Sequence, residues 1–250
     1  MSLGIILLVL IVGIFVGFIN TLSGGGSLLT MPMLIFLGLP TAVANGTNRF
    51  AVMVQNIVAV VNFKRQGYFD LKLNFMLGIP AVIGSIFGSF YAISLSDEIF
   101  NKILATVMFL ILFLIIKQPK HNITEEEPQF NYEKKIPAMI TFFIIGLYAG
   151  FIQVGVGFLV IAALRVLTNM SLVRINSIKV FLIGIYMVAS YLVFVVGGYI
   201  DWVLAITLAI GTSIGAWIGA NFAVAKGDKW IKIVLSIMIS IMAIKLFFNI

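Results

Sequence analysis

The sequence repeats itself at a fixed separation of 131 residues, and this repeat limits the fold more than any other feature. The register holds without a gap from Gly24 to Asp97, which fall on Gly155 and Asp228. Other matched positions are Gly26 with Gly157, Asn45 with Asn176, Phe50 with Phe181, and Gly67-Tyr68-Phe69-Asp70 with Gly198-Tyr199-Ile200-Asp201. Chance matching of apolar residues does not produce one register over so long a stretch. We therefore expect one structural unit that is present twice.

The composition places both units in a lipid bilayer. Hydrophobic residues make up 62% of the chain and charged residues 10%, with a mean hydropathy of +1.17, whereas soluble domains carry roughly 25% charged residues. Apolar runs recur along the whole length, and most approach the ~20 residues that cross the hydrocarbon core. The net charge of +7 comes from cations that flank these runs, so it indicates membrane topology and no nucleic-acid partner. A doubled chain of this kind is typical of secondary transporters.

We expect an all-α polytopic membrane protein with about five helical segments in each repeat. The segments of the first repeat are residues 3–22, 28–39, 42–63, 71–93 and 99–116, and those of the second are residues 136–152, 158–167, 172–196, 202–224 and 231–248. The repeats thus occupy residues 1–116 and 136–250, joined by a polar cytoplasmic linker at residues 117–135. The first segment lacks a preceding basic residue and a cleavage site, which predicts a retained helix and no signal peptide.

The second segment of each repeat is short for a membrane span, and a glycine cluster precedes it. Each first pair of segments forms either one long broken helix or a hairpin whose second arm is a half-helix. The hairpin inverts the second repeat and collects twelve of the 16 cations on one side; only Lys102 and Lys245 lie opposite, and Arg49 and Lys179 lie within helices. Because basic loops stay in the cytoplasm, the inverted arrangement is favoured, with both termini outside.

The two glycine turns are the first candidate site. Their residues are Ser23, Gly24, Gly25, Gly26 and Ser27 in the first repeat and Gln153, Gly155 and Gly157 in the second. Glycine permits a sharp reversal or a close approach to a ligand, and non-helical backbone at membrane depth must face protein or a watery cavity. Each turn feeds a helix N-terminus, where unpaired N–H groups and about half a positive charge favour an anion. The alternative is close helix packing, which we expect for Gly13/Gly17, Gly84/Gly88, Gly146/Gly150 and Gly211/Gly215/Gly219.

A polar stripe on the third segment is the second candidate site. Its members are Asn45, Asn48, Arg49, Gln55, Asn56 and Asn62, and the eighth segment repeats it more thinly with Asn176, Lys179, Tyr186 and Ser190. Arg49 and Lys179 each cost roughly 2.5–3.5 kcal/mol at membrane depth on insertion scales, and no acidic residue lies inside an apolar segment to pair with them. An anionic ligand is the simplest missing partner. The alternative is that both cations snorkel or bind carbonyls at helix ends.

The groups that enzymes need are missing from the apolar segments. The chain has no cysteine, and its one histidine, His121, lies in the linker. Asp70 and Asp201 are matched across the repeats at segment ends, where we expect them to cap helices. Acid–base and metal chemistry therefore lack their residues, so we expect no enzyme, no cofactor and no metal site.

The same residues resemble the signatures of a known family. Gly17-Phe18, the turn at residues 23–27 leading into residues 28–32, and residues 44–50 (ANGTNRF) are similar to the first-half signature of the TauE/SafE family of sulfite-exporter-like permeases. Residues 150–157 and 174–181 (RINSIKVF) resemble its second-half signature. The resemblance implies a bacterial or archaeal plasma-membrane protein that moves sulfite, thiosulfate, sulfonates or related organic acids. It also implies a permeation site at the glycine turns and at residues 45–49 and 176–179, although Ala163 stands where the first repeat has Pro32.

We hypothesise a permease that carries a small anion by alternating access, with the two repeats rocking about the glycine turns. A passive anion channel is the alternative, and it would need a continuous pore. The expected partners are the anionic substrate and the lipid bilayer. The sequence leaves the direction of transport, the coupling ion and the oligomeric state open, a homodimer included.

Overall fold

The computed structural model describes residues 3–94, 96, 98–99, 102–103, 106, 130, 134–168 and 170–248. Its helices are α1 (Leu3–Ser23), α2 (Ser27–Phe36), α3 (Thr41–Arg65), α4 (Leu71–Ser94), α6 (Lys135–Phe151), α7 (Val156–Leu167), α8 (Leu172–Val196) and α9 (Trp202–Phe248). Within the described residues there is no strand, only an isolated bridge between Phe130 and Thr168. The all-α prediction is confirmed for this part of the chain. Most of the segment expected at residues 99–116, and of the linker, lies outside it.

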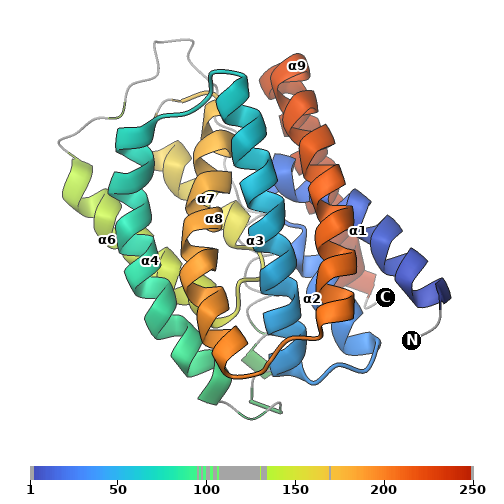
Figure 1. Ribbon diagram of the computed structural model, residues 1–250. Helices are drawn as coiled ribbons and strands as arrows, with labels where there is room; N and C mark the ends of the chain where they lie inside the picture. The colour runs from blue at the N-terminus through green and yellow to red at the C-terminus, as the bar shows by residue number, and fades with distance from the viewer. Residues whose placement is uncertain are drawn as a thin grey trace.

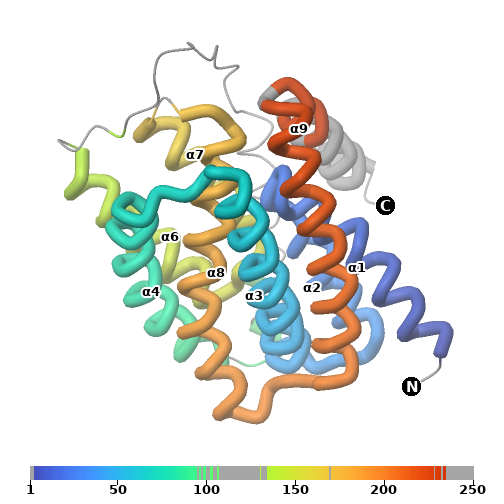
Figure 2. The backbone as a smooth tube through the Cα atoms, turned by 45° about the horizontal axis from the view of Figure 1, so that its top comes forward, coloured from blue at the N-terminus to red at the C-terminus, as the bar shows by residue number. Residues whose placement is uncertain are grey.

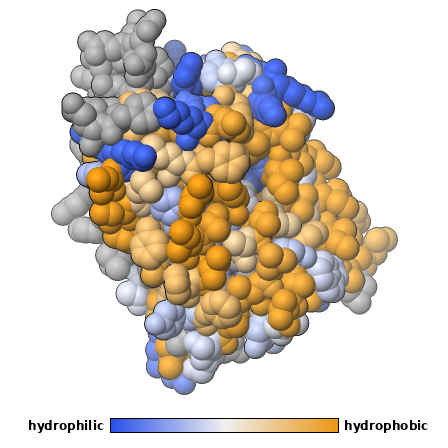
Figure 3. All heavy atoms as spheres, turned by 60° about the vertical axis from the view of Figure 1, so that its left-hand side comes forward, coloured by the Kyte–Doolittle hydropathy of each residue, from blue (hydrophilic) through white to orange (hydrophobic). Residues whose placement is uncertain are grey.

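In the described part of the chain, four helices are long and apolar enough to cross a membrane: α1, α4, α8 and the Trp202–Gly227 part of α9. The helix α3 is 25 residues long but carries the polar stripe, which lowers its hydropathy. On the face shown in Figure 3, apolar side chains form a broad band, and hydrophilic side chains gather at the upper end. This surface suits a bilayer, so the membrane assignment from the composition is confirmed.

The helices break where the glycine pattern predicts. The turn after α1 and the turn after α6 each lead into a short helix, α2 or α7. Near the other end of the chain, Gly227 has φ 68° and ψ −168° and splits α9 into two helical parts. A positive φ of this kind is open to glycine and strained for other residues, so the break falls between the predicted segments 202–224 and 231–248.

Helices α3 and α8 form the centre of the bundle (Figures 1 and 2), with α4 and α6 on one side and α9 and α1 on the other. The colours in Figure 1 show that α3 and α8 run in opposite directions. Each outer pair joins one helix from each sequence repeat, α1 with α9 and α4 with α6. The two central helices therefore lie between two interfaces, α1 with α9 and α4 with α6, each formed by one helix from each sequence repeat.

Small residues allow these outer pairs to approach closely. A methyl group on Gly17 of α1 would overlap the backbone of Thr212 in α9, and one on Gly146 of α6 would overlap the backbone of Ala81 in α4. Thr212 and Ala81 lie 131 residues apart, whereas Gly17 and Gly146 lie 129 apart, so the two contacts join similar helices with a shift of two residues on one side. The prediction that glycines at these positions serve helix packing is confirmed.

Two aspartates begin helices, as their positions in the sequence predict. The Asp70 carboxylate accepts the backbone N–H of Leu73 at 3.0 Å, and the Asp201 carboxylate accepts that of Leu204 at 3.0 Å. Each supplies an acceptor for an N–H group that the first helical turn leaves unpaired. Both aspartates are therefore accounted for by local structure.

The packing predicts that two glycine substitutions within helices change the thermal stability differently. Gly17→Ala forces α1 away from Thr212, and overpacking of this kind costs about 1–3 kcal/mol. Gly184→Ala in α8 is the matched control, because its methyl group would lie 3.6 Å from the Cβ of Asn56, an ordinary contact. Thermal melting in detergent should show a fall in Tm of several degrees for Gly17→Ala and an unchanged or higher Tm for Gly184→Ala. Equal melting of the two variants would contradict the close contact between α1 and α9.

Candidate functional site

The two glycine turns meet inside the bundle. The Gly155 N–H donates to Ser27 Oγ at 3.2 Å, and the Ser27 hydroxyl donates to the Gln153 carbonyl at 3.5 Å. The backbones of Gly24 and Gly157 touch so closely that a Cβ on either would overlap the other. Gly24 also has φ +80°, which L-residues rarely adopt. The contact therefore requires glycine at both positions, and the turn also requires it at position 24.

This contact differs from the arrangement expected from the sequence. The hypothesis placed an anion between two helix N-termini, but there is no room for a ligand between Gly24 and Gly157. The turns also supply acceptors to the helix starts, since the Leu28 N–H bonds the Gly25 carbonyl at 3.1 Å and the Phe158 N–H bonds the Gly155 carbonyl at 3.0 Å. In this conformation the turns are closed against each other.

Arg49 of α3 is fully buried and uses all five of its N–H donors on protein acceptors. Its Nε donates to Asn45 Oδ1 at 3.0 Å. Nη1 donates to the Ala149 carbonyl at 3.2 Å and to the Ser190 hydroxyl, and Nη2 donates to the carbonyls of Gly150 at 2.5 Å and Phe151 at 3.3 Å. Residues 149–151 are the last turn of α6, whose carbonyls have no helical partner. The guanidinium therefore caps the negative end of the α6 dipole.

Lys179 of α8 does the same for α1. Its buried ammonium donates to the carbonyls of Asn20 at 2.9 Å and Thr21 at 2.7 Å, and to Asn176 Oδ1 at 2.8 Å. A lysine ammonium has three N–H donors, so none remains. Lys179 thus satisfies carbonyls at the point where α1 ends inside the bundle.

An asparagine supports each cation at these helix ends. Asn45 donates to the Phe151 carbonyl at 3.4 Å, and Asn176 donates to the Leu22 carbonyl at 3.0 Å. In both cases α3 or α8 of one sequence repeat holds the interrupted helix of the other. The acceptors for the two cations are therefore helix-end carbonyls, the alternative that the sequence left open, and no carboxylate is involved.

The remaining predicted site residues include Ser23, Asn48 and Gln153, and two of these have a side-chain atom without a hydrogen-bond partner. The Ser23 hydroxyl bonds the Ile19 carbonyl within α1 at 2.9 Å. Asn48 and Gln153 are buried, and one side-chain oxygen of each lacks a hydrogen-bond donor. Every predicted site residue is thus at a turn, at a helix-end contact or on the stripe beside them.

Sequence reasoning missed Ser89 of α4. Its hydroxyl lies 2.5 Å from that of Ser190 and donates to the Gly150 carbonyl at 3.3 Å. The only signal in the sequence is a pair of serines, Ser85 and Ser89, four residues apart in the apolar second half of α4. Among the residues whose burial is described, no carboxylate is buried, and no described group of residues could hold a metal.

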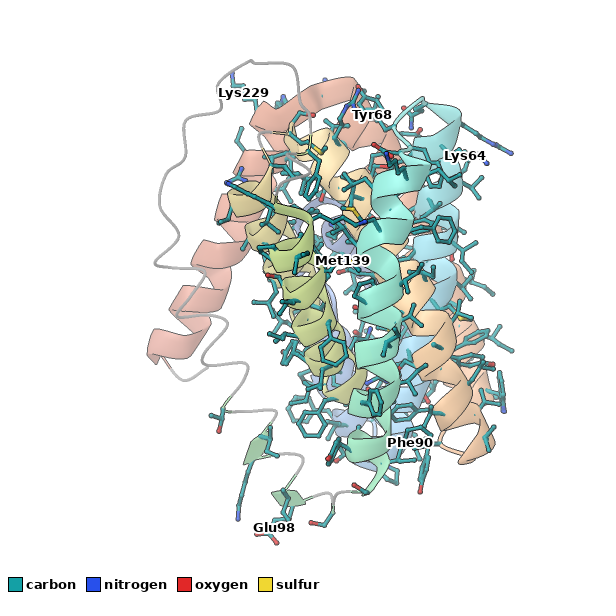
Figure 4. The ribbon with its side chains drawn as sticks, turned by 90° about the vertical axis from the view of Figure 1, so that its left-hand side faces the viewer. Lys64, Tyr68, Phe90, Glu98, Met139 and Lys229 are labelled. Carbon is teal, nitrogen blue, oxygen red and sulfur yellow. The ribbon has the colours of Figure 1, made fainter. Side chains whose placement is uncertain are left out.

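A cavity of about 440 Å³ opens at one end of the bundle, and no sequence pattern predicted it. It is lined by the loop at residues 67–72 together with Met170, Arg174, Ser177 and Ile178. Lys64, Tyr68 and Lys229 lie at this end, and Phe90 and Glu98 lie at the other (Figure 4). The cavity therefore begins at the end that the sequence predicts to be basic and leads toward the Asn176–Lys179 stretch of α8.

Comparison with known proteins identifies close similarities over the whole chain. A family model described as sulfite exporter TauE/SafE matches residues 9–246. A probable membrane transporter protein of Haemophilus influenzae is 28% identical over 251 residues, which cover 100% of this chain and 98% of the relative. The probable membrane transporter proteins YfcA of Escherichia coli K12 and YjnA of Bacillus subtilis are each 26% identical, covering 95% and 98% of this chain and 88% and 100% of the relatives. No solved structure matches the chain.

Because the Arg49 guanidinium caps the end of α6, we expect even a conservative substitution of Arg49 to lower the stability of the protein strongly. Arg49→Lys replaces five N–H donors by three, which leaves helix-end acceptors unpaired at about 1–3 kcal/mol each. We expect Tm in detergent to fall by several degrees. Arg65→Lys is the control, because Arg65 is exposed near the end of the same helix and such changes stay within about 0.5 kcal/mol. An Arg49→Lys protein that melts like the wild type would show that the carbonyls do not need the guanidinium.

Proposed function

The chain belongs to the sulfite exporter TauE/SafE family, and on this basis we propose that it is a plasma-membrane permease for small anions. The substrate class that fits best is sulfur oxyanions, organosulfonates and related organic acids. Membrane transport follows from the family and from the printed names of the relatives. The preference for an anion comes from the interior of the bundle.

One observation carries this preference. Arg49 and Lys179 are both fully buried, and no buried carboxylate accompanies them among the residues whose burial is described. Their carbonyl partners supply dipoles but no formal negative charge. In a medium of low dielectric constant, two positive charges without a negative partner favour the binding of an anionic substrate and disfavour that of a cation.

The two sequence repeats, residues 1–116 and 136–250, form an inverted pair in this proposal, with residues 117–135 as a cytoplasmic linker. The opposite directions of α3 and α8 support it. So do contacts that occur twice: Gly17 on Thr212 and Gly146 on Ala81, and the two cations on the ends of α6 and α1. Inverted repeats are a common basis for a site that can face either side of the membrane.

Alternating access is the mechanism that this arrangement favours. A passive channel needs a continuous pore, whereas the contact between Gly24 and Gly157 closes the space between the turns. We propose that the turns separate during transport, so that the turn residues 23–27, Gln153, Gly155 and Gly157 border the path together with Asn45, Asn48, Arg49, Asn176 and Lys179. The substrate can shift this equilibrium only by binding one conformation more tightly than the other.

Transport in proteoliposomes tests the proposal. Purified protein should take up ³⁵S-labelled sulfite or thiosulfate with saturation, and unlabelled substrate inside the vesicles should stimulate uptake by counterflow. A labelled alkali cation serves as the negative control. Ohmic anion currents without counterflow would favour a channel, and an absence of uptake or binding for sulfite, thiosulfate, sulfoacetate and acetate would contradict the proposed substrate class.

The inverted arrangement can be tested by cysteine labelling, because the chain contains no native cysteine. Lys64→Cys lies in the last turn of α3 and Val196→Cys ends α8, and both positions are exposed. In intact cells a membrane-impermeant maleimide should label Val196→Cys at once and Lys64→Cys only after permeabilisation. Lys229→Cys should behave like Lys64→Cys. Labelling of positions 64 and 196 from the same side would indicate parallel repeats.

A further inference from the structure

We propose that Gln55 of α3 and Tyr186 of α8 donate hydrogen bonds to the transported oxyanion at the centre of the bundle. This assignment rests on the proposed function and names the groups that recognise its substrate. It is based on which buried hydrogen-bond donors have an acceptor in the protein and which do not.

The two buried cations have no donor left for a ligand. Arg49 uses its five N–H groups on Asn45, Ser190 and the carbonyls at the end of α6. Lys179 uses its three on Asn176 and the end of α1. An anion could bind either cation directly only by displacing carbonyls that would then lack a donor inside the membrane. The cations therefore attract the anion through space, and other groups must contact it.

The buried side chains whose polar atoms all lack a partner include Asn74, near the start of α4, and Gln55 and Tyr186, near the middle of their helices; the last two fit this role. The relative exposure of Gln55 is 0% and that of Tyr186 is 1%. Both polar atoms of the Gln55 amide and the hydroxyl of Tyr186 have no hydrogen-bond partner in the described part of the chain. Buried polar atoms are nearly always paired, so unpaired ones at the centre of a transport protein point to a ligand.

Gln55 and Tyr186 both lie near the middle of their helices. Each is the fifteenth residue of a 25-residue helix, and the two are 131 residues apart, so they are register partners. The helices run in opposite directions and touch at their middles, where Asn56 lies against Gly184. Gln55 lies one position from Asn56 and Tyr186 lies two positions from Gly184, so both belong to the part of the two helices where they cross. The two residues differ in type, so the centre of the molecule is chemically asymmetric even though the repeats are matched.

The chemistry of the two groups suits an oxyanion. Tyr186 lies one helical turn before Ser190, whose hydroxyl accepts a hydrogen bond from Arg49. An amide NH₂ and a phenol O–H both donate to the oxygens of a sulfite, thiosulfate or sulfonate. Hydrogen bonds to an ionised acceptor are stronger than those between neutral groups, while neutral donors release the anion more readily than a direct ion pair. Recognition by these groups is therefore compatible with turnover.

The test uses substitutions that remove the polar atoms and keep the volume, Tyr186→Phe and Gln55→Met. Each should raise KM for labelled thiosulfate or sulfite in proteoliposomes by about tenfold or more, the loss expected for one hydrogen bond to a charged group. Because these atoms have no protein partner, Tm in detergent should stay the same or rise. Tyr191→Phe, on the same helix with its ring beside Phe50, is the matched control and should leave KM unchanged.

Two results would overturn the assignment. The first is KM within about twofold of the wild type for both variants while wild-type uptake is intact, since a lost hydrogen bond to an anion changes affinity by more than this. The second is a lower Tm for both variants, which would show that the groups serve the fold. A wild-type protein that neither binds nor transports any of these anions would overturn the proposed function itself, and this result is distinct from the other two.

Discussion

The structure depends on how helices that end inside a membrane satisfy their last carbonyl groups. Lipid offers no donors, so each unpaired carbonyl at that depth is costly. α6 stops at Phe151 and α1 stops at Ser23, and buried cations supply the missing donors, Arg49 to α6 and Lys179 to α1. Because each cation comes from the other sequence repeat, neither repeat can form its helix break alone. The same hydrogen bonds therefore stabilise both the helix breaks and the packing of the two repeats.

The same contacts determine the electrostatics of the interior. The carbonyl dipoles stabilise the two buried side chains and supply no formal negative charge. All N–H groups of Arg49 and Lys179 already have protein acceptors, so a bound anion must accept its hydrogen bonds from other residues. In the proposed mechanism, Arg49 and Lys179 attract the anion, and Gln55 and Tyr186 recognise it.

Much of the fold could be predicted from the sequence, because hydropathy, glycine and capping residues act locally. Helix ends, the breaks before α2 and α7, the packing of Gly17 and the caps at Asp70 and Asp201 all follow from short patterns. The partners of Arg49 could not be predicted, because they are backbone carbonyls about 100 residues away and carry no side-chain signature. The register also pairs Arg49 with Val180, which hides its equivalence to Lys179. Asn45 and Arg49 are four residues apart and Asn176 and Lys179 are three apart, yet both pairs reach a matching helix end.

The distribution of contacts indicates which of them opens if the protein alternates between two conformations. α3 is tied to the end of α6 by the hydrogen bonds of Arg49 and Asn45, and α8 is tied to the end of α1 by those of Lys179 and Asn176. Between the two turns, the described residues show the bonds of Ser27 at 3.2 and 3.5 Å, the contact of two glycines, and the Phe158 ring packed against Gly25. Movement should therefore keep each cation with the helix end that it caps and separate the turns instead. The moving units would then each combine helices from both sequence repeats, and glycine at positions 24 and 157 would allow the turns to close again without a steric barrier.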